Sequence, residues 1–332
     1  MRLRSGRLVI VLAAGLAMQT AAVGPAAAQQ YPAKRVEIVV PFVPGGGTDL
    51  ISRATANYLS KKWRQPLIVV NKPGGGGVIG ARAALKDARP DGYTVLMDIA
   101  TTASLMIGAW KSPPLTLADR KWAGRIVLDP MVFAVKVDAP WKDFRELSTW
   151  VKASPEKFVW SGGSGPSSIA RYATYEWFTQ IGVDPAKTKM VLTEGSADSM
   201  TKLAGGHVML AVHSVAEAKA MVEGGKIRLL AVLAPRRVSY IAGVPTAEEQ
   251  DLMKGVSVSW WAGISLPAAT PDAVVRKWEV ALAEMVKDPA FKAGTDRLWM
   301  NLSYLDSAQM AAFVEKQADY YSDLARKIGM RR

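Results

Sequence analysis

Two glycine-rich turns in this sequence have the residue types and spacing needed to bind an anion. Each follows an apolar segment and precedes a helical pattern, so each is expected to open a helix. Glycine lets the backbone turn sharply and present its N–H groups, and a helix N-terminus adds unpaired donors and a partial positive charge. We therefore predict that both turns bind a carboxylate or a phosphate. The residues are Pro44, Gly45, Gly46, Gly47, Thr48 and Asp49 in the first turn, and Gly162, Gly163, Ser164, Gly165, Ser167 and Ser168 in the second.

The hydroxyl groups of these turns also have a purely structural interpretation. Thr48, Ser164 and Ser167 can cap the helices that follow, with Pro166 in a first helical turn. A single hydroxyl can cap a helix and contact a ligand, so the sequence leaves both roles open.

A third glycine run has the spacing of a dinucleotide fingerprint. Gly75, Gly77 and Gly80 match it, and Asp98 lies about twenty residues further on, where a ribose-binding acid would stand. Asn71-Lys72-Pro73, however, separates the preceding strand from the first glycine. Because proline there disfavours a tight strand-to-helix turn, we predict no nucleotide cofactor.

The sequence offers little for catalysis or metal binding. Its two histidines, His207 and His213, have no partners at the spacing of a zinc site. Pro166 replaces the second glycine of a Gly-x-Ser-x-Gly elbow. We therefore predict no metal and no catalytic residue, although a triad of distant residues stays open. His207 is expected to face solvent, and His213 either faces a cleft or caps a sheet.

Strand-like and helix-like segments alternate along the chain, which is typical of an α/β protein with parallel strands. We predict strands at 36–42, 67–70, 93–97, 131–137, 158–160, 190–192, 208–212 and 229–232, and an extended segment at 256–266. We predict helices at 49–63, 79–86, 144–153, 196–203, 272–287 and 307–328, and one that ends near 180.

About three hundred residues are too many for one core, so we predict two α/β lobes. One lobe comprises residues 31–132 and 256–332, and the other residues 133–255. The chain crosses between them near 130–137 and 256–266, which predicts a hinge. Trp260 and Trp261 lie at the second crossing, where they can line the cleft or report on its closure.

The N-terminus reads as a secretory signal peptide over residues 1–28. Three arginines precede a short apolar stretch, Leu8–Met18, and Ala26-Ala27-Ala28 forms a small-residue cleavage site. The alternative is a retained N-terminal anchor. The chain has no cysteine, which excludes disulfides and a lipid anchor at the cleavage point. We predict a periplasmic protein stabilised by burial alone.

The basic charge does not indicate nucleic acid binding. The net charge is +13, and removing the three arginines of the signal leaves +10. These residues are scattered and form no basic cluster with interleaved aromatic residues. We predict a solvated basic surface that favours anionic ligands.

From Tyr31 to about Met330 the chain resembles a Bug-type solute-binding receptor of the tripartite tricarboxylate transporters. An ordered set of motifs carries the resemblance. They are Tyr31-Pro32, Pro41 to Asp49, Asn71-Lys72-Pro73 with Gly74 to Gly77 and Gly80, Pro90-Asp91-Gly92-Tyr93, Gly224-Gly225-Lys226-x-Arg228, Val244-Pro245-Thr246 and Pro267-x-x-Thr270-Pro271.

The resemblance implies a type II-like periplasmic binding protein with a ligand cleft between two lobes, each a mixed β-sheet flanked by helices. In such receptors the turns corresponding to Pro44–Asp49 and Gly162–Ser168 hold a ligand carboxylate, partly through ordered waters. Thr101 and Thr102 also border the cleft. The implied partners are a small organic carboxylate and the membrane subunits of the transporter, and we expect a monomer without enzymatic activity.

Two departures from the family pattern bear on the ligand. Relatives commonly carry Tyr-Lys-Gly where this chain has Thr193-Glu194-Gly195, and an Asp where it has His213. An acid at Glu194 would repel a second ligand carboxylate. The substitutions therefore widen the ligand class to monocarboxylates, aromatic acids, and acids with an amine or amide at the far end. On this hypothesis Glu194→Lys raises the affinity for dicarboxylates.

Two other functional classes stay open from sequence. One is an exported α/β hydrolase that uses Ser164 or Ser167, which an ester turnover assay and its loss in Ser164→Ala would reveal. The other is a ligand-binding sensor that docks on a signalling protein instead of a transporter.

Overall fold

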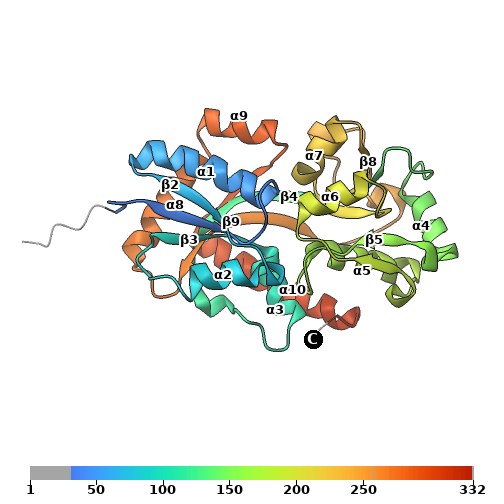
Figure 1. Cartoon of the computed structure of the whole chain (residues 1–332), viewed down its shortest axis with the longest axis horizontal. Coiled ribbons are helices and arrows are strands. Elements are labelled where there is room, and N and C mark those ends of the chain that lie inside the picture. Colours follow the sequence, from blue (N-terminus) through green and yellow to red (C-terminus); the bar gives the residue numbers. More distant parts are fainter. Residues whose placement is uncertain (1–30, 257, 331–332) are drawn as a thin grey trace, which may run out of the picture.

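The structure is a computed structural model that describes residues 31–256 and 258–330; the predicted signal segment lies outside these ranges. Strands and helices alternate along most of the chain (Figure 1). The strands are β1 (Val36–Val40), β2 (Leu67–Asn71), β3 (Thr94–Ile99), β4 (Arg120–Lys136), β5 (Val159–Ser161), β6 (Lys189–Val191), β7 (Ala211–Ser214), β8 (Ile227–Leu233), β9 (Ser259–Pro267) and β10 (Leu302–Leu305). The helices are α1 (Gly47–Trp63), α2 (Val78–Leu85), α3 (Ser104–Ala109), α4 (Phe144–Ala153), α5 (Ile169–Ile181), α6 (Ser196–Ala204), α7 (Val215–Glu223), α8 (Asp272–Met285), α9 (Pro289–Arg297) and α10 (Ser307–Lys327).

The first half of the molecule is built on a mixed sheet with strand order β10-β4-β9-β3-β1-β2. The sequence predicts parallel strands here, and β1 does pair in parallel with both β2 and β3. The returning strand β9 is antiparallel to β3 and to β4, so the sheet is mixed. The C-terminal segment thus returns to the first half of the molecule, where β9 pairs with β3 and β4, and β10 pairs with β4.

Strand β4 joins this sheet to the second half of the molecule. Residues 120–130 pair with β9, whereas residues 131–136 pair with β7 and β8. Figure 1 shows β4 and β9 running between the two halves. The protein is therefore a two-domain α/β protein; the exact residue limits of each lobe stay a prediction.

Several elements of the structure were not predicted from the sequence, or were predicted with other bounds. Strand β4 begins eleven residues earlier than predicted. The prediction missed its first part because Gly124, Arg125 and Pro130 interrupt the apolar pattern, whereas the strand continues through them with register shifts against β9. Helix α7 is missing from the prediction because no turn precedes it. Ser214 is the last residue of β7 and also the N-cap of α7. The short elements α3, α9 and β10 were also not predicted.

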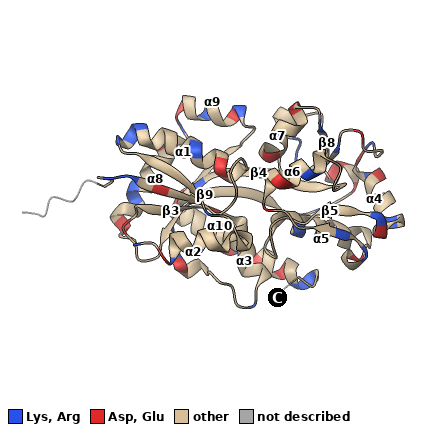
Figure 2. Ribbon diagram, in the orientation of Figure 1, with Lys and Arg blue, Asp and Glu red and all other residues tan. Residues whose placement is uncertain are grey.

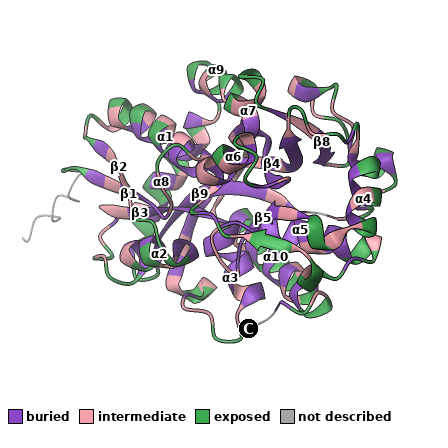
Figure 3. Ribbon diagram, turned by 45° about the vertical axis from the view of Figure 1, so that its right-hand side comes forward, coloured by how far each residue is buried: buried purple, intermediate pink, exposed green. Residues whose placement is uncertain are grey.

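Buried aromatic residues fill the second half of the molecule. Phe133, Phe144, Phe158, Trp177 and Phe178 are each fully buried and pack edge to face or tilted against one another. Such packing accounts for a stable core in a chain that has no disulfides. Figure 3 shows the buried residues along the central strands and the inward faces of the helices.

Charged residues lie mainly on the outer helices and loops of both halves, with both signs interspersed (Figure 2). This agrees with a solvated basic surface. Within the described residues no helix has the length and apolar character that a membrane span requires.

Candidate functional site

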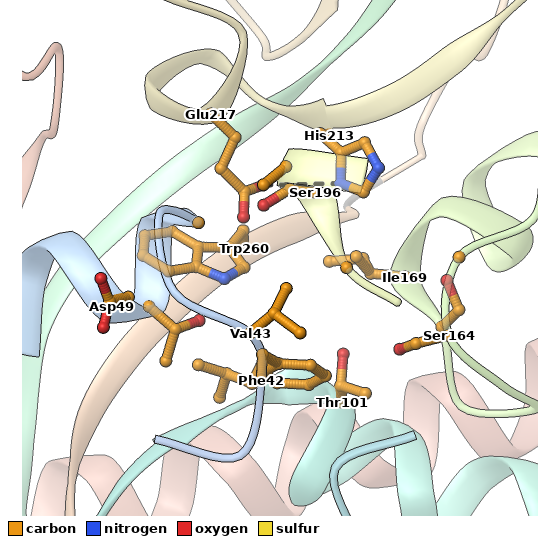
Figure 4. Close-up of a pocket in the computed structure, with 17 residues that line it drawn as sticks. Phe42, Val43, Asp49, Thr101, Ser164, Ile169, Ser196, His213, Glu217 and Trp260 are labelled. Atoms are coloured by element: carbon orange, nitrogen blue, oxygen red, sulfur yellow. Dashed lines mark ion pairs between the residues drawn. The ribbon is translucent and has the colours of Figure 1, made fainter. Parts of the chain in front are cut away.

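A pocket lies between the two halves, at the point where α1, α5, α6 and α7 begin (Figure 4). The residues that line it are Phe42, Val43, Gly46, Thr48, Asp49, Ile99, Thr101, Gly163, Ser164, Ser168, Ile169, Gly195, Ser196, Ala197, His213, Glu217 and Trp260. Because a helix N-terminus carries unpaired N–H groups and a partial positive charge, these helix starts together favour an anion.

Asp49 holds the first glycine-rich turn in place. Its carboxylate accepts the N–H of Gly45 at 3.0 Å, two hydrogen bonds from Arg53 at 2.9 Å each, and one from the side-chain amide of Asn71 at 3.0 Å. Asn71 also donates to the carbonyl of Phe42. Burial alone would raise the pKa of Asp49, but these bonds outweigh it and hold the pKa below its ordinary value. The carboxylate therefore positions the turn.

The second turn is fixed to strand β6 and to the start of α5. The N–H of Gly162 donates to the carbonyl of Val191 at 2.9 Å, and the N–H of Thr193 donates to the carbonyl of Gly163 at 3.1 Å. Gly163 has φ +71°, and a Cβ there would lie 1.9 Å from the Ser168 hydroxyl oxygen. Glycine at this position is therefore required for Ser168 to approach.

Glycines also let the two halves meet around the pocket. A Cβ on Gly46 would lie 2.8 Å from Ser196 Oγ, and one on Gly47 would lie 2.9 Å from Glu217 Cγ. On the third glycine run, a Cβ on Gly76 would lie 3.0 Å from the carbonyl oxygen of Ser164. This run thus packs against the second turn across the cleft.

Asp98, the acid that a dinucleotide site would need, is buried inside the protein and hydrogen-bonded there. It is fully buried and bonded to Arg120 at 2.5 Å, to the Thr102 hydroxyl at 2.6 Å and to Ser265 at 2.7 Å. These bonds leave its carboxylate unable to face the cleft.

His213 and Glu217 form a buried pair in the pocket wall. His213 Nδ1 lies 3.6 Å from Glu217 Oε2, and each side chain is 8% exposed. The backbone N–H and the hydroxyl of Ser214 also approach Oε2, each at 3.1 Å. Burial alone would raise the pKa of Glu217, but His213, Ser196 and the Ser214 N–H hold that pKa below its ordinary value. Glu217 is therefore ionised at neutral pH.

The pocket contains about half of the residues predicted from sequence. Gly46, Thr48, Asp49, Thr101, Gly163, Ser164, Ser168, Gly195 and His213 line it. Outside its lining lie Pro44, Gly45, Gly47, Thr102, Gly162, Gly165, Ser167 and Glu194. Glu194 is exposed, and its N–H is bonded to Asp198.

The alternative interpretation of the hydroxyl groups as helix caps is wrong. Gly46 is the N-cap of α1, so Thr48 lies inside that helix. Ser168 is the N-cap position of α5 but makes no side-chain capping bond, and Pro166 lies before the helix. The hydroxyls of Thr48 and Ser164 thus lie in the pocket lining and are not N-caps.

Sequence reasoning missed Glu217, Ser196 and most of the apolar residues that line the pocket. Glu217 could have been found from the sequence, because Ser214-x-x-Glu217 has the pattern of a capping box, which places both residues at a helix start. Trp260 lines the pocket, one of the two roles foreseen for it, whereas Trp261 is fully buried and donates to Gln317 at 2.6 Å.

The pocket suits a small anion with an apolar body. None of the described residues that line it is Lys or Arg; the N-termini of α1 and α5, beside Thr48, Ser164 and Ser168, supply the positive end that attracts an anion. Phe42, Val43, Ile99, Ile169 and Trp260 provide an apolar wall. The free cavity is about 50 Å³, enough for a few water molecules or a small group. In the described residues no cluster of three or more His, Asp or Glu side chains could hold a metal.

Comparison with known proteins gives consistent matches over most of the chain. A family model described as tripartite tricarboxylate transporter family receptor matches residues 51–330. The UPF0065 protein in the gbd 5′ region of Cupriavidus necator is 29% identical, over 96% of this chain and 96% of its own. The structure of the periplasmic binding protein BugD superimposes with a TM-score of 0.84 at 27% identity, covering 91% of this chain and 100% of BugD. A TctC solute binding protein from Polaromonas is 30% identical with a TM-score of 0.64, covering 90% and 99%.

Proposed function

Because the chain belongs to the tripartite tricarboxylate transporter receptor family, and is thus a solute-binding protein, we propose that it captures a small organic carboxylate in the periplasm for the membrane subunits of such a transporter. The observation that carries the proposal is the meeting of the N-termini of α1 and α5 at one pocket, together with the hydroxyl-bearing residues Thr48, Ser164 and Ser168. This arrangement favours a carboxylate over a cation.

The two glycine-rich turns have separate parts in the proposed binding. Gly46 and Thr48 present the start of α1, from the first half of the molecule. Ser164 and Ser168 present the start of α5, from the second half. A carboxylate that bonds to both turns links the two halves, so binding and closure of the cleft are coupled.

The experiment is thermal unfolding of the exported protein against a panel of carboxylates and their neutral amides. A ligand at a hundred times its dissociation constant stabilises the native state by roughly 2.7 kcal/mol, which raises the melting temperature. We expect at least one carboxylate to raise it and its amide to have no effect.

Variants tie the effect to the pocket. Thr48→Ala and Ser164→Ala should reduce the shift, whereas Ser239→Ala, an exposed serine outside the pocket lining, should leave it intact. A panel in which no carboxylate raises the melting temperature would contradict the proposal. Delivery to a transporter is tested by uptake of the same carboxylate in cells with and without the gene.

A further inference from the structure

The pocket has two chemically different sides. Figure 4 shows Phe42, Thr101 and Ser164 on one side and Glu217, Ser196 and His213 on the other. The first side consists of turns and hydroxyls suited to a carboxylate. The second side contains an ionised acid, Glu217, beside an imidazole. A ligand that spans the pocket therefore meets a negative charge at its far end.

The other carboxylate that lines the pocket is already compensated. Asp49 forms an ion pair with Arg53 and accepts two further hydrogen bonds, from the Gly45 N–H and the Asn71 amide, in its own half of the protein. Glu217 has no Lys or Arg near it among the ion pairs of the described residues; its partner is His213. Among the ion pairs of residues 31–256 and 258–330, the charge at the far end of the pocket is thus that of the Glu217–His213 pair.

His213 contributes a polar atom that no group in the described part of the chain satisfies. The residue is 6% exposed, and its Nε2 has no hydrogen-bond partner. Pairing of His213 with Val132 in the sheet fixes its backbone, and Glu217 faces the other ring nitrogen, Nδ1. In the neutral imidazole whose Nδ1–H faces the Glu217 carboxylate, Nε2 carries a lone pair and accepts a hydrogen bond. Buried polar atoms are nearly always paired, and because His213 lines the pocket, a ligand group is the partner that we assign to Nε2.

We propose that His213 and Glu217 form a specificity subsite that accepts a hydrogen-bond donor at the far end of the ligand. The cognate ligand is then a monocarboxylate that bears a hydroxyl, amine or amide N–H, and dicarboxylates are disfavoured. This inference rests on the proposed function, because it assumes that the carboxylate lies at the glycine-rich turns. The acid at the far end is Glu217, whereas the sequence suggested Glu194.

Glu217 and His213 both favour a ligand with a hydrogen-bond donor at its far end. A donor that bonds to Nε2 pairs this buried atom, and a donor that bonds to Glu217 meets a charge of favourable sign. A second carboxylate meets the charge of Glu217 without a neighbouring cation, and an unsubstituted apolar end leaves Nε2 unpaired. The subsite therefore selects by attraction and by repulsion together.

Two matched ligand series test this on the exported wild-type protein by titration calorimetry. One series is benzoate, 4-hydroxybenzoate, 4-aminobenzoate and terephthalate. The other is pentanoate, 5-hydroxypentanoate, 5-aminopentanoate and glutarate. Within a series only the far end changes. We expect a donor-bearing acid to bind about tenfold or more tightly than both the unsubstituted acid and the diacid of its series.

Variants of Glu217 and His213 test whether these residues cause the preference for donor-bearing acids. Glu217→Gln keeps the shape and removes the charge, so the ratio of diacid to donor-acid affinity should rise about tenfold. His213→Leu should reduce the preference for the donor acid over the unsubstituted acid. Glu176→Gln, a buried glutamate outside the pocket that is bonded to Lys327, is the matched control and should keep the wild-type ratios.

The outcomes separate the two proposals. If diacids bind as tightly as donor acids in both series, or if the ratios are the same in wild type, Glu217→Gln and His213→Leu, the subsite inference is overturned and carboxylate binding still stands. If none of the eight acids binds, the proposed function itself fails.

Discussion

Asp129 is a buried carboxyl in β4, and its replacement by asparagine should stabilise the protein increasingly as the pH rises. The side chain is fully buried; one oxygen accepts the N–H of Asn301 at 2.7 Å, and the other has no hydrogen-bond partner among the residues that the structure describes. Burial raises the pKa of Asp129 to about 8, with the negative charge of Glu217 adding to the effect and the Asn301 bond opposing it. Asp129 therefore keeps its proton in the folded protein at neutral pH.

The magnitude follows from proton linkage. The ordinary pKa is 3.8, so between about pH 4 and about pH 8 the unfolded chain has lost a proton that the folded protein keeps. Stability from this group is complete below pH 4 and is lost as the pH rises through that window, by about 1.4 kcal/mol per pH unit. Asp129→Asn has no such proton, so its stability relative to wild type should rise by roughly 3 kcal/mol between pH 5 and pH 7.

The measurement is urea unfolding of both proteins at pH 5, 6 and 7, compared as a difference at each pH. Asp319→Asn, an exposed carboxyl on α10, controls for the loss of one charge. A difference between Asp129→Asn and wild type that stays constant with pH would refute the reasoning, because it would mean that Asp129 is ionised in the folded protein.

Two further predictions concern the first glycine-rich turn. Gly47→Ala places a Cβ 2.9 Å from Glu217 Cγ, so the two halves cannot approach as closely, and carboxylate binding measured by calorimetry should weaken about tenfold. The control is Gly243→Ala, where an added Cβ has no described atom within 4 Å. Equal affinities of Gly47→Ala and wild type would show that this close approach is not needed for binding. Asp49 has a lowered pKa, so its contribution to stability is present above its ordinary pKa and is lost as the pH falls through the folded value. Asp49→Asn should remove this part of the acid sensitivity and lower stability at pH 7, measured by urea unfolding at pH 3 to 7; an unchanged acid transition would argue against the Arg53 ion pair.

Local patterns determine much of the fold. The α/β alternation, the parallel pairing of β1 with β2 and β3, and the bounds of helix α4 all follow from the apolar period and from turn residues. Strand β4 does not follow, because its first part is paired through register shifts that a sequence window cannot reveal. Helix α7 was not predicted, because Ser214 is both the last residue of a strand and the N-cap of the helix, so no turn separates the two.

The same division holds for the site. The sequence by itself located the two glycine-rich turns that we propose bind an anion, because glycine and a following helix are local features. It also singled out His213 as a residue with two possible roles. Only the tertiary structure decided that an acid faces the far side of the pocket and that this acid is Glu217, whereas Glu194 is exposed. The physical reason is that the pocket forms where separate helices begin, and their meeting depends on long-range strand pairing through β4 and β9.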